Sequence, residues 1–177
     1  MMFMSKVLDS HEPSSSAHSI KLILAIQLTK CARDLLEDAK MNRRYLPGTW
    51  VGNADPATVL AAADDPDGSV ALEVRAAVAR LLSLADQFYA SGAEGYRYLP
   101  LRAHLSIAVA ARVYRQIGLQ LATADFAWHE GRQVTSRRTK LRCSVLAMAG
   151  LVGRFGPARG QHDGTLHTAL RGLPYVA

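Results

Sequence analysis

The chain has 177 residues and a formal net charge of +6, and 49% of its residues are hydrophobic while only 7% are aromatic. Ala and Leu dominate the hydrophobic residues, a mix that favours packed helices over a β-sandwich. The positive charge predicts anionic partners, but it does not choose between nucleic acid, an acidic membrane surface and phosphorylated small molecules. The sequence has neither a run of about 18 apolar residues nor a long apolar leader, so we expect a cytoplasmic protein.

The first half of the chain predicts one long helix and one long loop. Residues 1–18 are expected to be a disordered lead, because they are poor in apolar residues and carry a serine run. A helix is predicted from about residue 19 to 40, where apolar residues recur at helical spacing without Gly or Pro. Pro47 and Gly48 then predict a turn. Residues 52–68 are expected to form a loop around one short helical piece.

The second half predicts three helices. The first spans about residues 69–98 and has one apolar face. The second follows Pro100 and is apolar on nearly every side, which is typical of a central helix. The last covers about residues 136–152, and residues 153–177 are expected to be a flexible tail. Residues 19–152 therefore read as one all-α domain.

The most informative pattern is a set of polar residues in the first helix. A helix of 3.6 residues per turn places Gln27, Asp34 and Asp38 within one narrow arc. Two carboxylates on adjacent turns repel each other by a few tenths of a kcal/mol, but a cation between them reverses the sign. Magnesium prefers oxygen ligands and binds one or two carboxylates together with substrate phosphates. The arc is therefore one candidate for a metal site.

Basic residues flank these carboxylates, and the guanidinium fork of arginine suits phosphate oxygens. They are Arg33, Lys40, Arg43 and Arg44. A carboxylate-bound cation beside arginines would bind a diphosphate. The alternative is a solvated helix face on which the acidic residues pair with nearby Lys and Arg, and spacing alone favours that alternative.

This segment resembles the second aspartate-rich motif of the squalene/phytoene synthase family. That motif reads Q-L-T-N-x-x-R-D-x-x-x-D, followed by a basic stretch and R-x-Y-L-P. The matching residues are Gln27, Leu28, Thr29, Arg33, Asp34, Glu37, Asp38, Arg44, Tyr45, Leu46 and Pro47. The Y-L-P ending is more similar to the phytoene branch than to the squalene branch.

Later segments extend the resemblance to about residues 20–152. They are similar to the family's tyrosine-glycine-LP segment, its central V-Y-x-x-I helix and its closing R-x-V…K-L segment. The corresponding residues are Tyr89, Gly95, Leu99 and Pro100, then residues 113–117, then Arg132, Gln133, Val134, Lys140 and Leu141.

The resemblance implies an all-α, class I terpenoid synthase fold and a prenyl-diphosphate transferase. Such enzymes condense two geranylgeranyl diphosphates head to head into phytoene, in carotenoid biosynthesis, with magnesium (or manganese) held between two aspartate-rich motifs. The implied metal ligands are Asp34 and Asp38 with Gln27, and the implied diphosphate ligands are Arg33, Arg44 and Arg132. Tyr45 and Tyr114 would line the cavity near the reacting centre. A core tyrosine with a bonded hydroxyl is the structural alternative for Tyr114.

Two departures from the family matter. No aspartate-rich motif precedes the one described, and the cluster Asp64, Asp65 and Asp67 lies in a predicted solvated turn. We therefore expect the C-terminal half of a synthase, inactive alone, that needs a missing N-terminal half or a homologous chain. Lys30 stands at the family's Asn position, and lysine has no acceptor with which to bind magnesium.

Two other functions remain open. A non-enzymatic remnant or partner subunit that binds prenyl diphosphate would also lack the first motif. The basic run at residues 132–142 would suit nucleic acid, but no aromatic residues or binding motif accompany it, so we expect no nucleic-acid partner. Greasy substrates would favour peripheral contact with a membrane.

Overall fold

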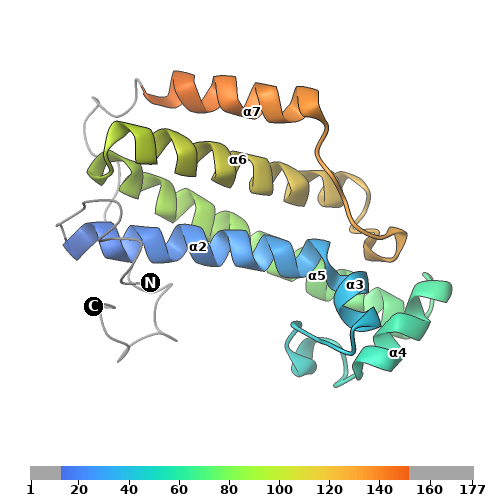
Figure 1. Cartoon of the computed structure of the whole chain (residues 1–177). Coiled ribbons are helices and arrows are strands. Elements are labelled where there is room, and N and C mark those ends of the chain that lie inside the picture. The colour runs from blue at the N-terminus through green and yellow to red at the C-terminus, as the bar shows by residue number, and fades with distance from the viewer. Residues whose placement is uncertain (1–12, 152–177) are drawn as a thin grey trace. The chain divides into compact units, whose positions relative to one another are not determined.

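The computed structural model describes residues 13–151, which contain helices and no strand (Figure 1). The long helices are α2 (Pro13–Arg33), α5 (Ser69–Ala93), α6 (Leu101–Thr123) and α7 (Arg137–Gly150). The short elements are α3 (Leu35–Lys40), α4 (Pro56–Ala61) and the 3-10 turns η1 (Gly48–Trp50), η2 (Ala62–Asp64), η3 (Glu94–Tyr98) and η4 (Trp128–Glu130). The predicted all-α class is confirmed. None of the described helices is long and apolar enough to cross a membrane.

The predicted helices differ from the observed ones mainly at their ends. Helix α2 begins at Pro13, so residues 13–18 of the expected lead are helical, while the rest of that lead and the tail at 153–177 lie outside the described residues. The helix predicted at 69–98 ends at Ala93 and continues as η3. Helix α7 starts after Ser136, whose hydroxyl accepts the N–H of Thr139, so an N-cap fixes that boundary.

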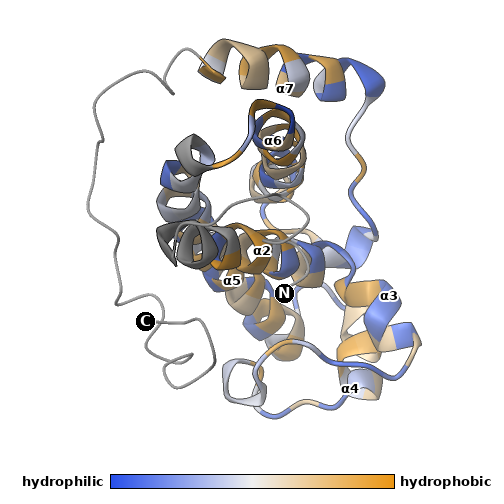
Figure 2. Cartoon of the chain, turned by 60° about the vertical axis from the view of Figure 1, so that its left-hand side comes forward, coloured by the Kyte–Doolittle hydropathy of each residue, from blue (hydrophilic) through white to orange (hydrophobic). Residues whose placement is uncertain are grey.

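The chain divides into two compact units. The first contains the residues up to Ile26, Asp86–Val113 and the residues from Ser136. Within it α2 and α5 approach closely, because a Cβ on Gly92 would lie only 2.7 Å from Leu22 Cγ. Helix α7 has hydrophilic residues at its N-terminal end and mainly apolar ones after them (Figure 2).

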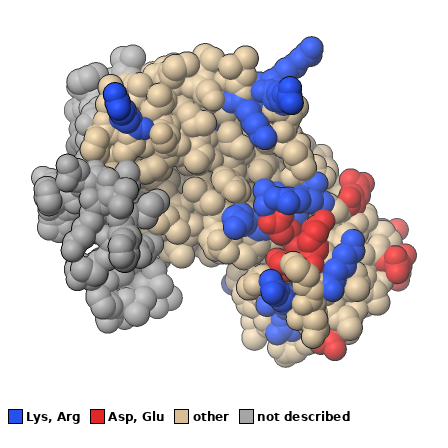
Figure 3. Space-filling model, viewed as in Figure 1, with Lys and Arg blue, Asp and Glu red and all other residues tan. Residues whose placement is uncertain are grey.

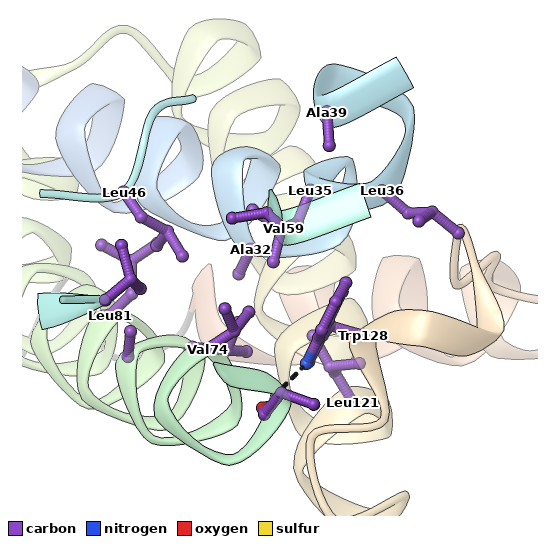
Figure 4. Close-up of a cluster of buried hydrophobic side chains, with 14 residues drawn as sticks. Ala32, Leu35, Leu36, Ala39, Leu46, Val59, Val74, Leu81, Leu121 and Trp128 are labelled. Carbon is purple, nitrogen blue, oxygen red and sulfur yellow. Dashed lines mark hydrogen bonds between the residues drawn. The ribbon is translucent and has the colours of Figure 1, made fainter. Parts of the chain in front are cut away.

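The second unit comprises Gln27–Ala85 and Tyr114–Thr135, and it contains every residue proposed for the site. Its core is drawn in Figure 4, where side chains from α2, α3, α4 and α5 meet Leu121 and Trp128. The Trp128 indole N–H donates to the Ala71 carbonyl at 3.4 Å, which ties η4 to α5. Helix α3 packs against both α4 and η4. The core therefore fixes α3, and with it the acidic motif, from two sides.

Candidate functional site

The acidic motif lies where α2 gives way to α3. Asp34 has φ −97° and ψ 13°, so the chain leaves helical geometry at one residue. The backbone ladder continues on either side, because Asp34 N–H donates to the Lys30 carbonyl at 2.9 Å and Asp38 N–H to the Asp34 carbonyl at 2.8 Å. The uninterrupted helix predicted over residues 19–40 is therefore wrong at a single position, which is one of the predicted metal ligands.

The break gives Asp34 an unusual partner, its own neighbour in sequence. Arg33 Nε donates to Asp34 Oδ1 at 2.7 Å and Arg33 Nη2 to Oδ2 at 2.6 Å. Adjacent side chains do not face each other on a regular helix. The local departure at Asp34 is thus coupled to this two-pronged ion pair, the strongest geometry available to a carboxylate and an arginine.

A second arginine reaches the same carboxylate from far along the chain. Arg132 Nε lies 3.2 Å from Asp34 Oδ1, and the Arg132 side chain is 54% exposed. It follows Gly131, whose φ of +88° is a backbone conformation that side chains disfavour. The sequence did not predict this pairing or the role of Gly131, and the only signal for it was a glycine directly before the arginine.

These arginines control the charge of Asp34. Burial acts to raise the pKa of the Asp34 carboxyl, but the hydrogen bonds and charge of Arg33, followed by the charges of Arg132 and Lys30, outweigh it and hold the pKa below its usual value. Asp34 is therefore ionised at neutral pH. Acidic and basic side chains meet on the molecular surface around the second unit (Figure 3).

Arg33 is held firmly. Its side chain is only 9% exposed, and its guanidinium carbon lies 5.7 Å from the centre of the Tyr114 ring. The hydrogen bond to Asp34 raises the pKa of Arg33, against the opposing effect of burial. The half-buried side chain of Tyr114 thus lies beside Arg33 of the motif, although the two residues are 81 positions apart in the chain.

Asp38 lies one turn beyond Asp34 and is electrostatically coupled to it. Burial raises the pKa of Asp38, the negative charge of Asp34 raises it further, and Arg43 and Lys30 oppose the shift. The positive charge of Lys30 acts to lower the pKa of both carboxyl groups. The two aspartates therefore share one electrostatic environment, as their spacing predicted.

Gln27 and Tyr45 are less constrained. Gln27 is exposed, and its amide contacts the Cys31 sulfur at 3.9 Å, one turn along α2. The Tyr45 side chain is 55% exposed on the segment between α3 and η1. Their assignment as metal ligand and cavity residue stays a prediction.

Arg44 has a partner of its own in the loop that follows α3. Its Nη1 donates to the Ala54 carbonyl, and its Nη2 would lie 2.9 Å from a Cβ added to Gly48. The guanidinium therefore closes the loop between α3 and α4. In this arrangement Arg44 stabilises the fold, and its predicted contact with a diphosphate stays a prediction.

Glu37, a further acidic residue of the motif, has a buried carboxylate oxygen close to the turn that carries Arg132. Its Oε2 is buried and has no hydrogen-bond partner, and its Oε1 lies 3.9 Å from the position of a Cβ on Gly131. Glu37 thus lies under the turn that carries Arg132. Within the described part of the chain, no three His, Cys, Asp or Glu side chains are grouped so that they could hold one metal ion.

Comparison with known proteins gives a consistent result. The squalene/phytoene synthase family model matches residues 1–142. A 15-cis-phytoene synthase from Enterobacter agglomerans is 36% identical over 146 residues, which is 82% of this chain and 48% of that protein. A phytoene synthase from Pseudescherichia vulneris is 34% identical over 162 residues, 89% of this chain and 50% of that protein. The chain spans about half the length of these curated relatives. No solved structure matches it significantly.

Proposed function

We propose, from the premise that this chain belongs to the squalene/phytoene synthase family, that it supplies one diphosphate-binding half of a phytoene synthase-type prenyltransferase. The observation that carries the proposal is that two arginines, Arg33 and Arg132, both contact the carboxylate of Asp34. The proposed substrate is geranylgeranyl diphosphate, which the resemblance to the phytoene branch of the family implies, and the relatives named phytoene synthase support that branch.

The donor set at the α2–α3 junction suits magnesium, or manganese in its place. Asp34 and Asp38 are oxygen donors one helical turn apart, and the charge of Asp34 raises the pKa of Asp38. With substrate phosphates and water, two carboxylates are enough for such an ion. When bound, the metal would neutralise the diphosphate and make it a better leaving group.

The basic side chains would bind and orient the diphosphate. Arg33 presents a guanidinium over the ring of Tyr114, and Arg132 adds a second one from an exposed turn. Lys30 adds a third positive charge that acts on both carboxylates. Together they would hold phosphate oxygens through charge-assisted hydrogen bonds, which are roughly twice as strong as neutral ones.

A second part of the synthase would complete this site. Because the chain spans about half of its relatives, we assign the opposite wall and the other aspartate-rich motif to an N-terminal half or a homologous chain. The isolated chain is then expected to make no phytoene from geranylgeranyl diphosphate and magnesium. Product formation at the rate of an ordinary synthase would contradict this assignment.

The metal site can be tested on the chain itself. Manganese binding should be measured by electron paramagnetic resonance for the wild type, for Asp34→Asn and for the control Asp55→Asn, an exposed aspartate at the start of α4. Loss of a ligand carboxylate should weaken binding at least as much as loss of a supporting residue, which costs about 10–100-fold. The control should bind as the wild type does.

Two results would replace the proposal. If Asp34→Asn binds manganese as well as the wild type, the metal site is not at the α2–α3 junction. If the chain binds farnesyl or geranylgeranyl diphosphate equally well with and without metal, the non-enzymatic binding subunit is the better description.

We also propose a cytoplasmic location with peripheral membrane contact through α7. Four basic residues lie in its N-terminal half and no acidic residue occurs in it, while Leu141, Val145 and Met148 are each at least half exposed. The basic end of α7 would be drawn to anionic lipid headgroups, and the exposed apolar residues after it would add contact area. The chain should float with phosphatidylglycerol vesicles and not with phosphatidylcholine vesicles. Equal recovery in both would contradict the proposal.

A further inference from the structure

We infer that Arg132 is an exchangeable counter-cation at Asp34, which the metal displaces and which then binds the diphosphate. The inference rests on the function proposed for this site. It adds an order to the binding events, because the same side chain would neutralise the carboxylate when metal is absent and the substrate when metal is present.

The two arginines on Asp34 differ in their freedom to move. Arg33 is nearly buried and binds through two nitrogens, at 2.7 and 2.6 Å. Arg132 is 54% exposed, and its Nε lies 3.2 Å from the carboxylate. Breaking the Arg33 pair would leave a charge buried without its partner, which is costly, whereas an exposed pair contributes about 0.2–1 kcal/mol. Arg132 is therefore the arginine that the metal displaces from Asp34.

The acceptor capacity of Asp34 shows where a cation would compete with the arginines. A carboxylate offers about four lone-pair sites, two on each oxygen. Oδ1 faces the Nε atoms of both arginines, and Oδ2 accepts Arg33 Nη2. Three of the four sites therefore face guanidinium nitrogens, and one on Oδ2 stays open. A cation that binds Oδ1 has to replace one of the two guanidinium groups, and a cation on Oδ2 is repelled by both groups while they stay, so loss of Arg132 from Asp34 favours metal binding in either position.

The position of Arg132 allows it to move without disturbing the core. It follows Gly131 in the exposed turn between η4 and α7, outside any regular element. A diphosphate at the metal would offer Arg132 a doubly or more highly charged acceptor in place of Asp34. Metal and diphosphate should then bind cooperatively, and by thermodynamic linkage each should raise the affinity for the other.

The test compares variants of the full chain by manganese binding without diphosphate. Arg132→Gln removes the competing cation, Arg132→Lys restores a charge at that position, and Arg138→Gln removes one exposed positive charge from α7 as a control for net charge. Arg132→Gln should bind manganese about two- to five-fold more tightly than the wild type, as expected for loss of an exposed ion pair. Arg132→Lys should lie between the two, and Arg138→Gln should match the wild type.

A second measurement follows the arginines directly. In proton–nitrogen NMR spectra the Nε–H signal of Arg132 should shift when magnesium is added, while that of Arg33 stays close to its starting position. Magnesium with inorganic diphosphate should shift the Arg132 signal again, because the side chain then donates to phosphate.

The outcomes separate this inference from the proposed function. If manganese binding depends on Asp34 but Arg132→Gln binds no tighter than Arg138→Gln, the site stands and the exchange is wrong. Weaker binding in Arg132→Gln, or an Arg132 signal that magnesium leaves unmoved, likewise refutes the exchange. If no variant binds manganese, the proposed metal site fails and the inference fails with it.

Discussion

Two six-residue helices, α3 and α4, pack against each other, and each begins after an aspartate. Asp55 caps α4 in the ordinary way, since its carboxylate accepts the N–H of Thr58 at 2.7 Å. Asp34 makes no such side-chain cap at α3 and gives its carboxylate to Arg33 and Arg132 instead. The pKa of both carboxyl groups is lowered, Asp55 by Thr58 and Asp34 by the arginines against the effect of burial.

The difference separates a carboxylate that caps a helix from one that is available to a ligand. Asp55 satisfies a backbone N–H that would otherwise lack a partner within α4, so its position is explained by local structure. The Asp34 side chain caps no N–H of α3, and its partners Arg33 and Arg132 are side chains that a ligand can compete for. An aspartate at a helix start that does not cap the helix is therefore a better candidate for function than one that does.

The largest expected effect on stability comes from neutralising Asp34. Asp34→Asn should lower the free energy of unfolding by about 1–3 kcal/mol, because charge-assisted hydrogen bonds to a nearly buried arginine are lost. Asp55→Asn should change stability less, because Asn caps a helix about as well as Asp. Urea denaturation of both variants measures the difference, and an equal or greater loss for Asp55→Asn would contradict the contrast.

The contribution of Asp34 to stability should disappear in acid. The folded-state pKa of Asp34 lies below its unfolded value of 3.8, so its contribution is fully present well above that pH and is lost as the pH falls through the folded-state pKa. The gap in unfolding free energy between wild type and Asp34→Asn should be constant above about pH 5 and should narrow below about pH 4. If the difference in unfolding free energy widens in acid, the pKa of Asp34 is raised in the folded state rather than lowered.

Replacing Lys30 tests the balance of charge around the carboxylates. Lys30→Asn removes an ammonium that acts on both aspartates and restores a neutral oxygen donor. A charge about 5 Å from a divalent ion is repelled by roughly 1.7 kcal/mol even at a dielectric constant of 80, so manganese affinity should rise by up to about 20-fold. A lower affinity for metal in the variant would show that Lys30 assists the site.

The smallest expected effect belongs to Asp38. Its raised pKa means that burial and the charge of Asp34 disfavour its ionised form in the folded state, a cost that is present at neutral pH and relieved as pH falls through the folded-state pKa. Asp38→Asn should therefore stabilise the chain by a few tenths of a kcal/mol at pH 7, as for a like-charge pair on adjacent turns. The same variant should weaken manganese binding. A clear loss of stability would mean that Asp38 supports the fold.

Local sequence patterns predicted most of the helices and the motif. The apolar spacing in α5 and α6 repeats within each helix, so it can be read without knowledge of distant partners. The same holds for the spacing of Asp34 and Asp38, whose electrostatic coupling agrees with their predicted placement on adjacent turns. The break at Asp34 could not be predicted in this way, because no Gly or Pro marks it.

The amino-acid sequence by itself determined the all-α class, the family and the acidic motif, since these depend on periodicity and on residues close together in the chain. Only the tertiary structure decided which charges meet. It brought Arg132 to Asp34 across 98 positions and directed Arg44 to a loop carbonyl. The physical reason is that an ion pair depends on distances of a few ångströms, which are set by how α3 and η4 pack against the core rather than by spacing along the chain.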